Sequence, residues 1–286
     1  MLAVILTTIA SISLFTYILH LFTPSSSLII DSRILVLTAH PDDECMFFAP
    51  TLLKLTQKKN RNEVFGLCLS TVFQLVLQHL CLSFDSVGNF DGLGHLRKHE
   101  LTKSYETLGV DSSHVTVLDH PELQDGMKNN WKDALITEIV KSFAEKNEIN
   151  VYRKAGTIPI YVVYRILFKI ITFDNYGVSG HPNHIACFNG ISYLHTKVES
   201  TLRLRTYNLT SVPLLRKFIA LFDLPVTIIL RLFPTFSKDV LYVSAPSEYL
   251  AAHRAMRHHH TQLVWFRWLY VMFSRYMYIN ELRRNV

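Results

Sequence analysis

A histidine and three acidic residues lie within five positions in the segment AHPDDE, residues 39–44. The six residues before it, RILVLT at 33–38, form an apolar and branched run that predicts a buried strand. At the carboxyl end of a parallel strand, such side chains are well placed to bind a ligand. Imidazole and carboxylate groups are ligands for a zinc-like ion, and a spare carboxylate beside the metal can act as a base. The segment therefore predicts one half of a metal site.

A second source of histidines lies far along the chain, in the segment SGHPNH at residues 179–184. His181 and His184 are three residues apart, as are His40 and Asp43 in the first segment. Three of these four side chains could coordinate one face of a metal ion and leave coordination positions open for water and substrate. A lone pair of histidines at this spacing is more often a surface turn. Together, the two strand-end motifs predict a catalytic metal centre.

The segments around these motifs alternate between strand and helix. Such alternation indicates an α/β class, with a Rossmann-like, mostly parallel sheet flanked by helices. Residues 161–173 are apolar but too short and too charged to span a membrane, which favours a strand or an interfacial piece. The predicted strands are 33–38, 63–71, 115–118 and 240–244, and the predicted helices are 46–57, 96–108, 131–145 and 185–195.

The N-terminal residues 2–22 carry no formally charged side chain and match the roughly 20 residues that cross a bilayer as a helix. We therefore expect an N-terminal transmembrane helix, with residues 1–27 as anchor and linker. A cleaved signal peptide is disfavoured because no basic region precedes the span, and a buried soluble helix is the remaining alternative. Basic residues follow the span and none precedes it, so the positive-inside tendency puts the body of the protein in the cytoplasm.

The charge and cysteine patterns exclude some classes of protein. The net charge of +6 is scattered until the C-terminal tail, so we expect no nucleic-acid partner. The four cysteines form no CxxC pair, which favours buried, reduced thiols over a disulfide framework.

Two further segments suggest contact with lipid. Residues 212–234 are apolar but interrupted by charges and prolines, which favours a segment on a membrane surface or one that caps the core. Residues 251–286 mix aromatic residues with arginine and predict a basic, aromatic C-terminal helix. That composition suits a bilayer interface or a packed helix with a basic outer face, and less well a site for single-stranded nucleic acid.

Several of these stretches resemble the LmbE-like family of zinc-dependent N-acetylglucosaminyl de-N-acetylases, and most closely its eukaryotic branch, which acts on N-acetylglucosaminyl-phosphatidylinositol in GPI-anchor synthesis. The resemblance implies a deacetylase domain over residues 28–250, an amide hydrolase with Zn²⁺ or another divalent metal, and a glycolipid substrate. It also implies the endoplasmic reticulum membrane, with the catalytic domain cytoplasmic. The alternatives are deacetylation of another N-acetylated sugar, or a catalytically impaired membrane scaffold. The matching stretches are TAHPDDECMFFAPT, LRKHEL, TFDNYGVSGHPNH and WFRWLYVMFSRYMYIN.

Position by position, the resemblance implies a division of labour among the motif residues. His40, Asp43 and His184 would hold the metal. Asp42 would be the base that takes a proton from the metal-bound water. His181 would stabilise the tetrahedral oxyanion or donate a proton to the leaving amine.

The resemblance also implies substrate contacts from Arg97, Glu100 and His259. An arginine suits a phosphate or sugar hydroxyls, although Arg97 and Glu100 could instead form a surface ion pair. His259 lies in a run of three histidines, for which a solvated surface run is the alternative. Glu44 would orient the metal ligands or cap the following helix.

Two apolar stretches, 72–87 and 152–169, have no counterpart in the family pattern. They are either real insertions or products of an imperfect gene model. If they are real, the second could displace the loop that carries His181 and His184.

Overall fold

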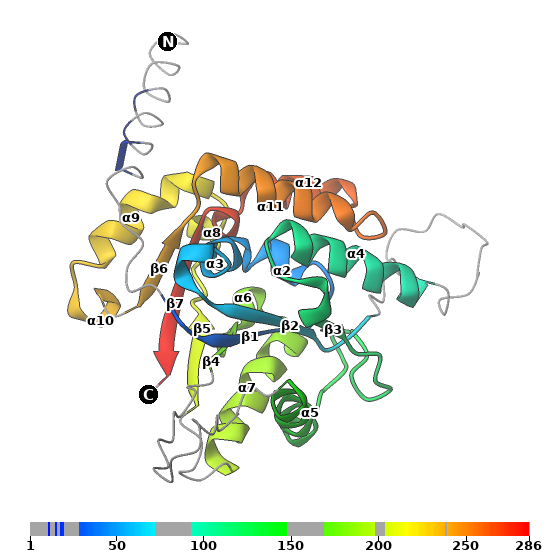
Figure 1. Ribbon diagram of the computed structural model, residues 1–286. Coiled ribbons are helices and arrows are strands. Elements are labelled where there is room, and N and C mark those ends of the chain that lie inside the picture. The colour runs from blue at the N-terminus through cyan, green and yellow to red at the C-terminus, as the bar shows by residue number, and fades with distance from the viewer. Residues whose placement is uncertain are drawn as a thin grey trace, which may run out of the picture.

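The computed structural model describes residues 29–71, 93–147, 169–197, 204–237 and 239–285, with four N-terminal helical residues at 11, 15, 18 and 19. Within these residues, seven strands form one sheet in the order β3-β2-β1-β4-β5-β7-β6 (Figure 1). All strands are parallel except β7, which is antiparallel to both of its neighbours. The strands are β1 (Arg33–Thr38), β2 (Glu63–Cys68), β3 (Val115–Val117), β4 (Lys169–Phe173), β5 (Arg205–Leu209), β6 (Val240–Val243) and β7 (Ile279–Asn285).

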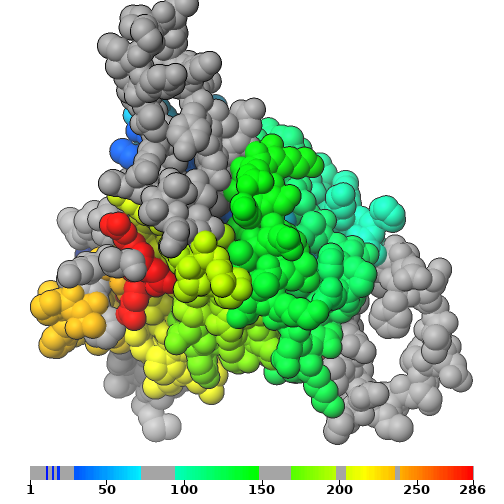
Figure 2. Space-filling model, turned by 90° about the horizontal axis from the view of Figure 1, so that it is seen from below, coloured from blue at the N-terminus to red at the C-terminus, as the bar shows by residue number. Residues whose placement is uncertain are grey.

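Helices cover both faces of this sheet. On one face α11 packs against α2, α3 and α4, and on the other α7 packs on β1 and β4 with α5 beside it (Figure 1). Figure 2 shows α5 and α7 side by side on that second face. The helices are α2 (Asp43–Met46), α3 (Ala49–Leu55), α4 (Leu93–Thr107), α5 (Asp133–Lys146), α6 (Gly177–Gly180), α7 (Pro182–Lys197), α8 (Leu214–Lys217), α9 (Asp223–Leu230), α10 (Pro234–Ser237), α11 (Pro246–His258) and α12 (Trp265–Phe273). The 3₁₀ turns are η1 (Lys58–Asn60), η3 (Ser112–His114), η4 (Ala220–Phe222) and η5 (Arg275–Met277).

The strand order has its switch point at β1. The chain passes from β1 to β2 on one side and later returns to β4 on the other. Crossovers that leave in opposite directions open a crevice at the carboxyl ends of such strands. Residues 34–38 are buried throughout, as expected for a strand covered on both faces. The segment that follows β1 is thus held at the crevice by a rigid strand.

The predicted α/β class and mostly parallel sheet are confirmed. The helix predicted over 46–57 is divided into α2 and α3, which are separated by Phe47 and Phe48, two side chains buried in the core. Three cysteines, Cys45, Cys68 and Cys187, are buried free thiols, as expected.

Most of the predicted transmembrane segment, 2–22, lies outside the described residues. Among those described, no helix is long and apolar enough to cross a membrane. The stretches 72–87 and 152–168 also lie outside the described residues.

The C-terminal segment 251–286 differs from the single helix expected for it. It contains the end of α11, the helix α12, the turn η5 and the strand β7. The strand forms because its hydrogen bonds join the edges of β5 and β6, and residues 279–282 are buried there. The end of the chain is therefore part of the same sheet as the motif strands.

Candidate functional site

Three polar side chains from the two motifs converge at the switch point. His184 Nε2 lies 3.3 Å from His40 Nδ1 and 3.2 Å from Asp43 Oδ1. His40 Nδ1 lies 3.8 Å from Asp43 Oδ2. Ligand atoms at about 2.0–2.1 Å from a tetrahedral zinc ion are about 3.3 Å from one another. His40 and His184 therefore have the spacing of two ligands to one ion, with Asp43 beside both. The ligand atoms of His181 also lie within 4.8 Å of those of His40 and His184, so these three histidines form a group that could hold a metal ion.

The other atoms of these side chains are already engaged. His184 donates from Nδ1 to the Gly177 carbonyl at 3.1 Å, because a carbonyl oxygen can only accept. Asp43 Oδ2 accepts from the backbone N–H groups of Ala39 and His40 at 3.0 and 2.8 Å. The lone pairs that remain on His184 and Asp43 face one another. A cation at this point would satisfy them, so the residues present fit a divalent metal ion.

A further carboxylate, Asp125, fixes the orientation of His40. Its Oδ1 lies 3.0 Å from His40 Nε2 and it is 3% exposed. This ion-pair contact involves Nε2 of His40, whereas Nδ1 is the nitrogen that lies near the other two ligands. Burial lowers the pKa of His40, but the neighbouring carboxylates of Asp125 and Asp43 outweigh it and raise the pKa to about 10. The charges around His40 thus favour a cation here.

The loop before α7 is shaped around His184. Gly177 has a φ of +61°, and a Cβ on it would lie 2.8 Å from the Cβ of His184. Any other residue would therefore collide with the ligand that its own carbonyl orients. The ring of His184 stacks on Phe173, the last residue of β4, with centroids 4.0 Å apart. The strand end and the loop together position this histidine.

Asp42, the predicted base, lies between β1 and α2 with an unusual backbone conformation. Its φ of 98° is in the left-handed region, which is strained for a residue with a side chain. Its Oδ2 lies 2.5 Å from Nη1 of Arg267, on α12. Burial raises the pKa of Asp42 to about 6, although the charge of Arg267 opposes the rise. A carboxylate with such a pKa is mostly ionised at pH 7 and still able to take up a proton.

His181, the second predicted catalytic residue, lines the same cavity. Its Nδ1 accepts from the backbone N–H of Asn183 at 3.3 Å, which leaves the proton on Nε2. Burial, with the charges of His40 and His184, lowers the pKa of His181 to about 4. The neutral ring therefore presents an N–H donor at neutral pH. Of the two roles predicted, this geometry favours stabilisation of an oxyanion.

The cavity has a polar floor and an apolar side. It has a volume of about 600 Å³ and contains all five predicted metal and catalytic residues. Its apolar side comes from α12 and from the end of α8, the segments in which the sequence suggested contact with lipid. The side chains on that side are Phe218, Phe266, Leu269, Tyr270 and Phe273.

The three residues predicted to contact substrate lie outside the lining of this cavity. His259 is fully buried and lies 2.6 Å from Glu44 Oε1. Glu100 accepts from the backbone N–H and the hydroxyl of Thr261. Arg97 is buried and donates to the Thr71 carbonyl. The surface ion pair and the solvated histidine run, given above as alternatives, are thus not what the structure shows.

Arg97 nevertheless feels the charge of carboxylates at the site. Burial lowers its pKa, and the charges of Glu100, Asp42 and Asp125 act in the opposite direction. A role for Arg97 towards substrate stays a prediction.

Glu44 contacts the backbone of Asp42, the predicted base. It is fully buried, its Oε2 accepts from the backbone N–H of Asp42 at 3.0 Å, and its Oε1 accepts from the Ser104 hydroxyl and meets His259. The predicted orienting role fits these contacts. With Cys45 and His259 it also forms a fully buried group of potential metal ligands, but its acceptors are already used within the protein.

Asp125 and Arg267 were not identified from the sequence. Asp125 follows the predicted strand 115–118, and the carboxyl ends of parallel strands meet at one edge, so an acid after that strand was a usable signal. Arg267 carried no such signal. Its contact with Asp42 depends on how α12 folds back over the first motif.

The chain is similar to proteins of a known family. A model of the family described as PIG-L, GlcNAc-PI de-N-acetylase, matches residues 35–194. The chain is 35% identical over 251 residues to N-acetylglucosaminyl-phosphatidylinositol de-N-acetylase of Bos taurus, over 88% of this chain and 83% of that protein. It is 30% identical over 276 residues to the protein of that name from Saccharomyces cerevisiae, over 88% and 81%. The chain belongs to this family.

The sequence motifs predicted the GlcNAc-PI de-N-acetylase family, and this prediction is confirmed. A solved structure supports the fold. N,N'-diacetylchitobiose deacetylase from Pyrococcus horikoshii superposes with a TM-score of 0.54 at 14% identity, over 89% of this chain and 84% of that one.

Proposed function

We propose that this protein removes the acetyl group from N-acetylglucosaminyl-phosphatidylinositol, giving acetate and glucosaminyl-phosphatidylinositol, the second step of GPI-anchor biosynthesis. Membership of the family supports the reaction and the substrate. The observation in the structure that carries the proposal is the convergence of His40, Asp43 and His184 beside a buried carboxylate. A metal-dependent amide hydrolase needs such a set.

Zn²⁺, or another divalent metal, is the proposed cofactor, and His40, Asp43 and His184 would hold it. When bound, such an ion lowers the pKa of water towards about 7 and polarises a carbonyl. Asp42 takes the proton of the attacking water, and Arg267 holds the carboxylate at 2.5 Å so that it stays in position. Nε2 of His181 donates a hydrogen bond to the oxygen on which negative charge develops.

The membrane is the second proposed partner. The exposed sides of α8 and α12 carry large apolar side chains, and both helices contribute to the lining of the cavity, as expected of a surface that meets lipid. The endoplasmic reticulum, with the catalytic domain cytoplasmic, is the location that the family resemblance implies. The most exposed of these side chains are Leu214, Leu215, Trp265, Phe266, Leu269, Met272 and Phe273.

Acetate release by the purified, metal-loaded protein tests the proposal directly. Asp42→Asn and His184→Ala should each lower kcat/KM for the glycolipid at least about 100-fold, because one removes the base and the other a metal ligand. His195→Ala is the matched control, since this exposed histidine near the end of α7 contacts the Thr206 hydroxyl and does not line the cavity. Activity unchanged in either site variant would refute the assigned roles.

The same assay separates the alternatives. Equal turnover of a lipid-free N-acetylglucosaminide would favour a deacetylase of another N-acetylated sugar. A folded protein that binds no stoichiometric zinc would favour a catalytically impaired membrane scaffold.

A further inference from the structure

Lys217, the last residue of α8, is a buried cation without a carboxylate partner among the described residues. It is 7% exposed, and its Nζ lies 5.4 and 5.8 Å from the ring centroids of Phe218 and Tyr270. Burial lowers its pKa, and no carboxylate opposes that effect. A buried ammonium group is costly unless an anion or polar groups solvate it. Such a cost is commonly found where a ligand supplies the missing partner.

The position of Lys217 connects it with the candidate active site. It lines the cavity that contains the metal and catalytic residues. It also lines a neighbouring cavity of about 490 Å³, which is bordered by residues 174–179 and 211–214. Ser179 and Lys217 are the two residues that belong to both linings. The lysine thus lies where one cavity continues into the other.

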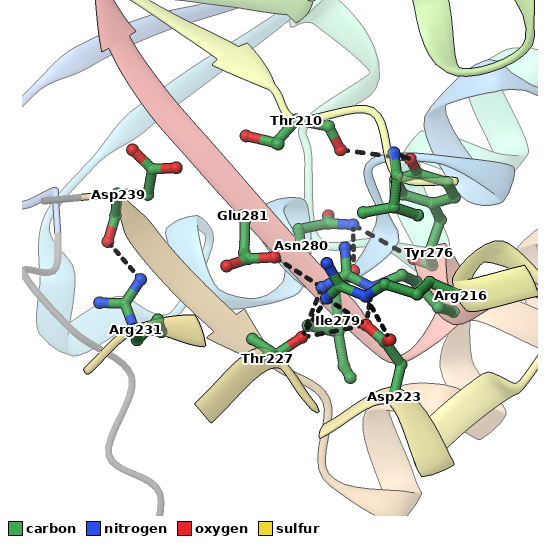
Figure 3. Close-up of polar contacts among 12 residues, drawn as sticks. Thr210, Arg216, Asp223, Thr227, Arg231, Asp239, Tyr276, Ile279, Asn280 and Glu281 are labelled. Carbon is green, nitrogen blue, oxygen red and sulfur yellow. Dashed lines mark hydrogen bonds and ion pairs between the residues drawn. The ribbon is translucent and has the colours of Figure 1, made fainter. Parts of the chain in front are cut away.

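A buried polar network holds α8 in this position. Arg216, the residue before Lys217, makes a bidentate ion pair with Asp223 on α9, at 2.7 and 2.9 Å (Figure 3). The fully buried Arg275 shares that carboxylate and also bonds Glu281 of β7. The network ties α8 to α9, to η5 and to the sheet. Arg216 is thus paired with a carboxylate inside the protein, whereas Lys217 lines the cavity and takes no part in the network.

The carboxylates that line the two cavities interact with other groups. Asp42 pairs with Arg267, and Asp43 faces the two histidine ligands. Asp174, in the second cavity, accepts from the backbone N–H and hydroxyl of Ser211. The partner that Lys217 lacks must therefore come from outside these residues, as a negatively charged ligand would.

Beyond Lys217 the surface becomes apolar. Leu214 and Leu215 of α8 are 73% and 78% exposed, and Phe218 is also exposed. The cavity thus has polar catalytic residues on its floor, Lys217 on its wall and apolar side chains at the surface beyond; its other cation, Arg267, is paired with Asp42. The proposed substrate has the same order, because its acetamido sugar is followed by inositol, a phosphodiester and acyl chains. Its single formal negative charge is on the phosphodiester.

We propose that Lys217 binds the phosphodiester of the glycolipid substrate and so sets the distance between the bilayer and the scissile amide. This inference rests on the proposed function. An ammonium group binds phosphate oxygens through charge-assisted hydrogen bonds. The lysine would thereby select substrates that carry phosphate at this distance from the sugar.

Three substrates test this inference with the metal-loaded, full-length protein. They are N-acetylglucosaminyl-phosphatidylinositol, its water-soluble head group with the phosphate retained, and N-acetylglucosaminyl-inositol without phosphate. Lys217→Met should lower kcat/KM about tenfold or more for the two substrates that carry phosphate, and leave the neutral one within about twofold. Lys217→Arg should restore most of the loss, since it keeps the positive charge.

Lys169→Met is the matched control. Lys169 is 8% exposed, its pKa is also lowered by burial, and it donates to the hydroxyl of Ser32. It is the first residue of β4, at the end of the strand that is far from the candidate site. Its loss should affect all three substrates alike.

An equal loss on all three substrates in Lys217→Met would mean that the lysine only supports the fold, and no loss would mean that it does not meet the substrate. Either result would overturn the inference. Failure of the wild-type protein to deacetylate the glycolipid would instead overturn the proposed function. If Lys217→Met lowered kcat/KM for the glycolipid but not for the water-soluble head group that retains the phosphate, the lysine would bind phosphate of the membrane surface and not of the substrate. That result would also count against the inference.

Discussion

At the scale of single residues, the candidate site depends on groups that neither bind the metal nor react. His40 could present either ring nitrogen, and the carboxylate of Asp125, 3.0 Å from Nε2, favours Nδ1 as the nitrogen that faces the other ligands. His184 is oriented in the same way by the Gly177 carbonyl. Such outer contacts fix the tautomer and direction of a histidine ligand. They explain how two flexible side chains can converge on one point before an ion is bound.

Asp125→Asn tests this orienting role. The amide keeps the size of the side chain but loses the charge. Its NH₂ group can also take the place of the carboxylate oxygen beside His40 Nε2, so His40 is no longer held in one tautomer. We expect the affinity for zinc to fall about 10- to 100-fold, with a parallel loss of deacetylation at limiting metal. Titration with a competing chelator measures the affinity directly.

Asp119→Asn is the control for that variant, because Asp119 follows the same strand but is exposed. If both variants bound zinc as the wild type does, the orienting role of Asp125 would be disproved. Activity lost at saturating zinc, with affinity unchanged, would instead indicate that Asp125 acts on His181, 3.8 Å away.

At the scale of helices and strands, local patterns predicted some elements better than others. β1 has the predicted bounds, because a branched apolar run followed by a polar motif is a local signal. β7 was missed because its sequence, INELRRN, is polar and becomes a strand only between the edges of β5 and β6. Likewise, the aromatic and basic composition of α12 did not reveal that Arg267 turns inward to Asp42.

The outward face of α12 gives a prediction at this scale. Trp265 and Trp268 are 75% and 36% exposed, whereas Trp131, the third tryptophan of the chain, is 5% exposed. Amphipathic rings on such a face are expected at the level of the lipid head groups. In vesicles that contain the full-length protein, brominated phospholipid should therefore quench the tryptophan fluorescence.

The variant Trp265→Phe with Trp268→Phe provides the comparison, since it retains only the buried Trp131. Quenching should disappear in this variant and persist in Trp131→Phe. Equal quenching in both would show that α12 does not lie at the bilayer.

At the scale of the whole molecule, the two motifs lie about 140 residues apart in sequence and meet because β1 and β4 are neighbours in the sheet. The sequence could supply the ligand types and their strand-end positions. It could not supply the strand order, the position of Asp125 or the orientation of Lys217, since each depends on contacts between distant segments. The metal proposed at the switch point would connect both sides of the crevice. It should therefore stabilise the fold as well as the reaction.

Thermal unfolding tests this last expectation. A ligand that binds only the folded state stabilises it by about 4 kcal/mol at a concentration 1,000 times its Kd. Zinc added to chelator-treated protein should thus raise Tm by several degrees, and His184→Ala should lose most of that rise because it removes one of the three ligands. His195→Ala, altered on the same helix but away from the crevice, should keep it. An equal rise in both variants would mean that zinc stabilises the protein from another site.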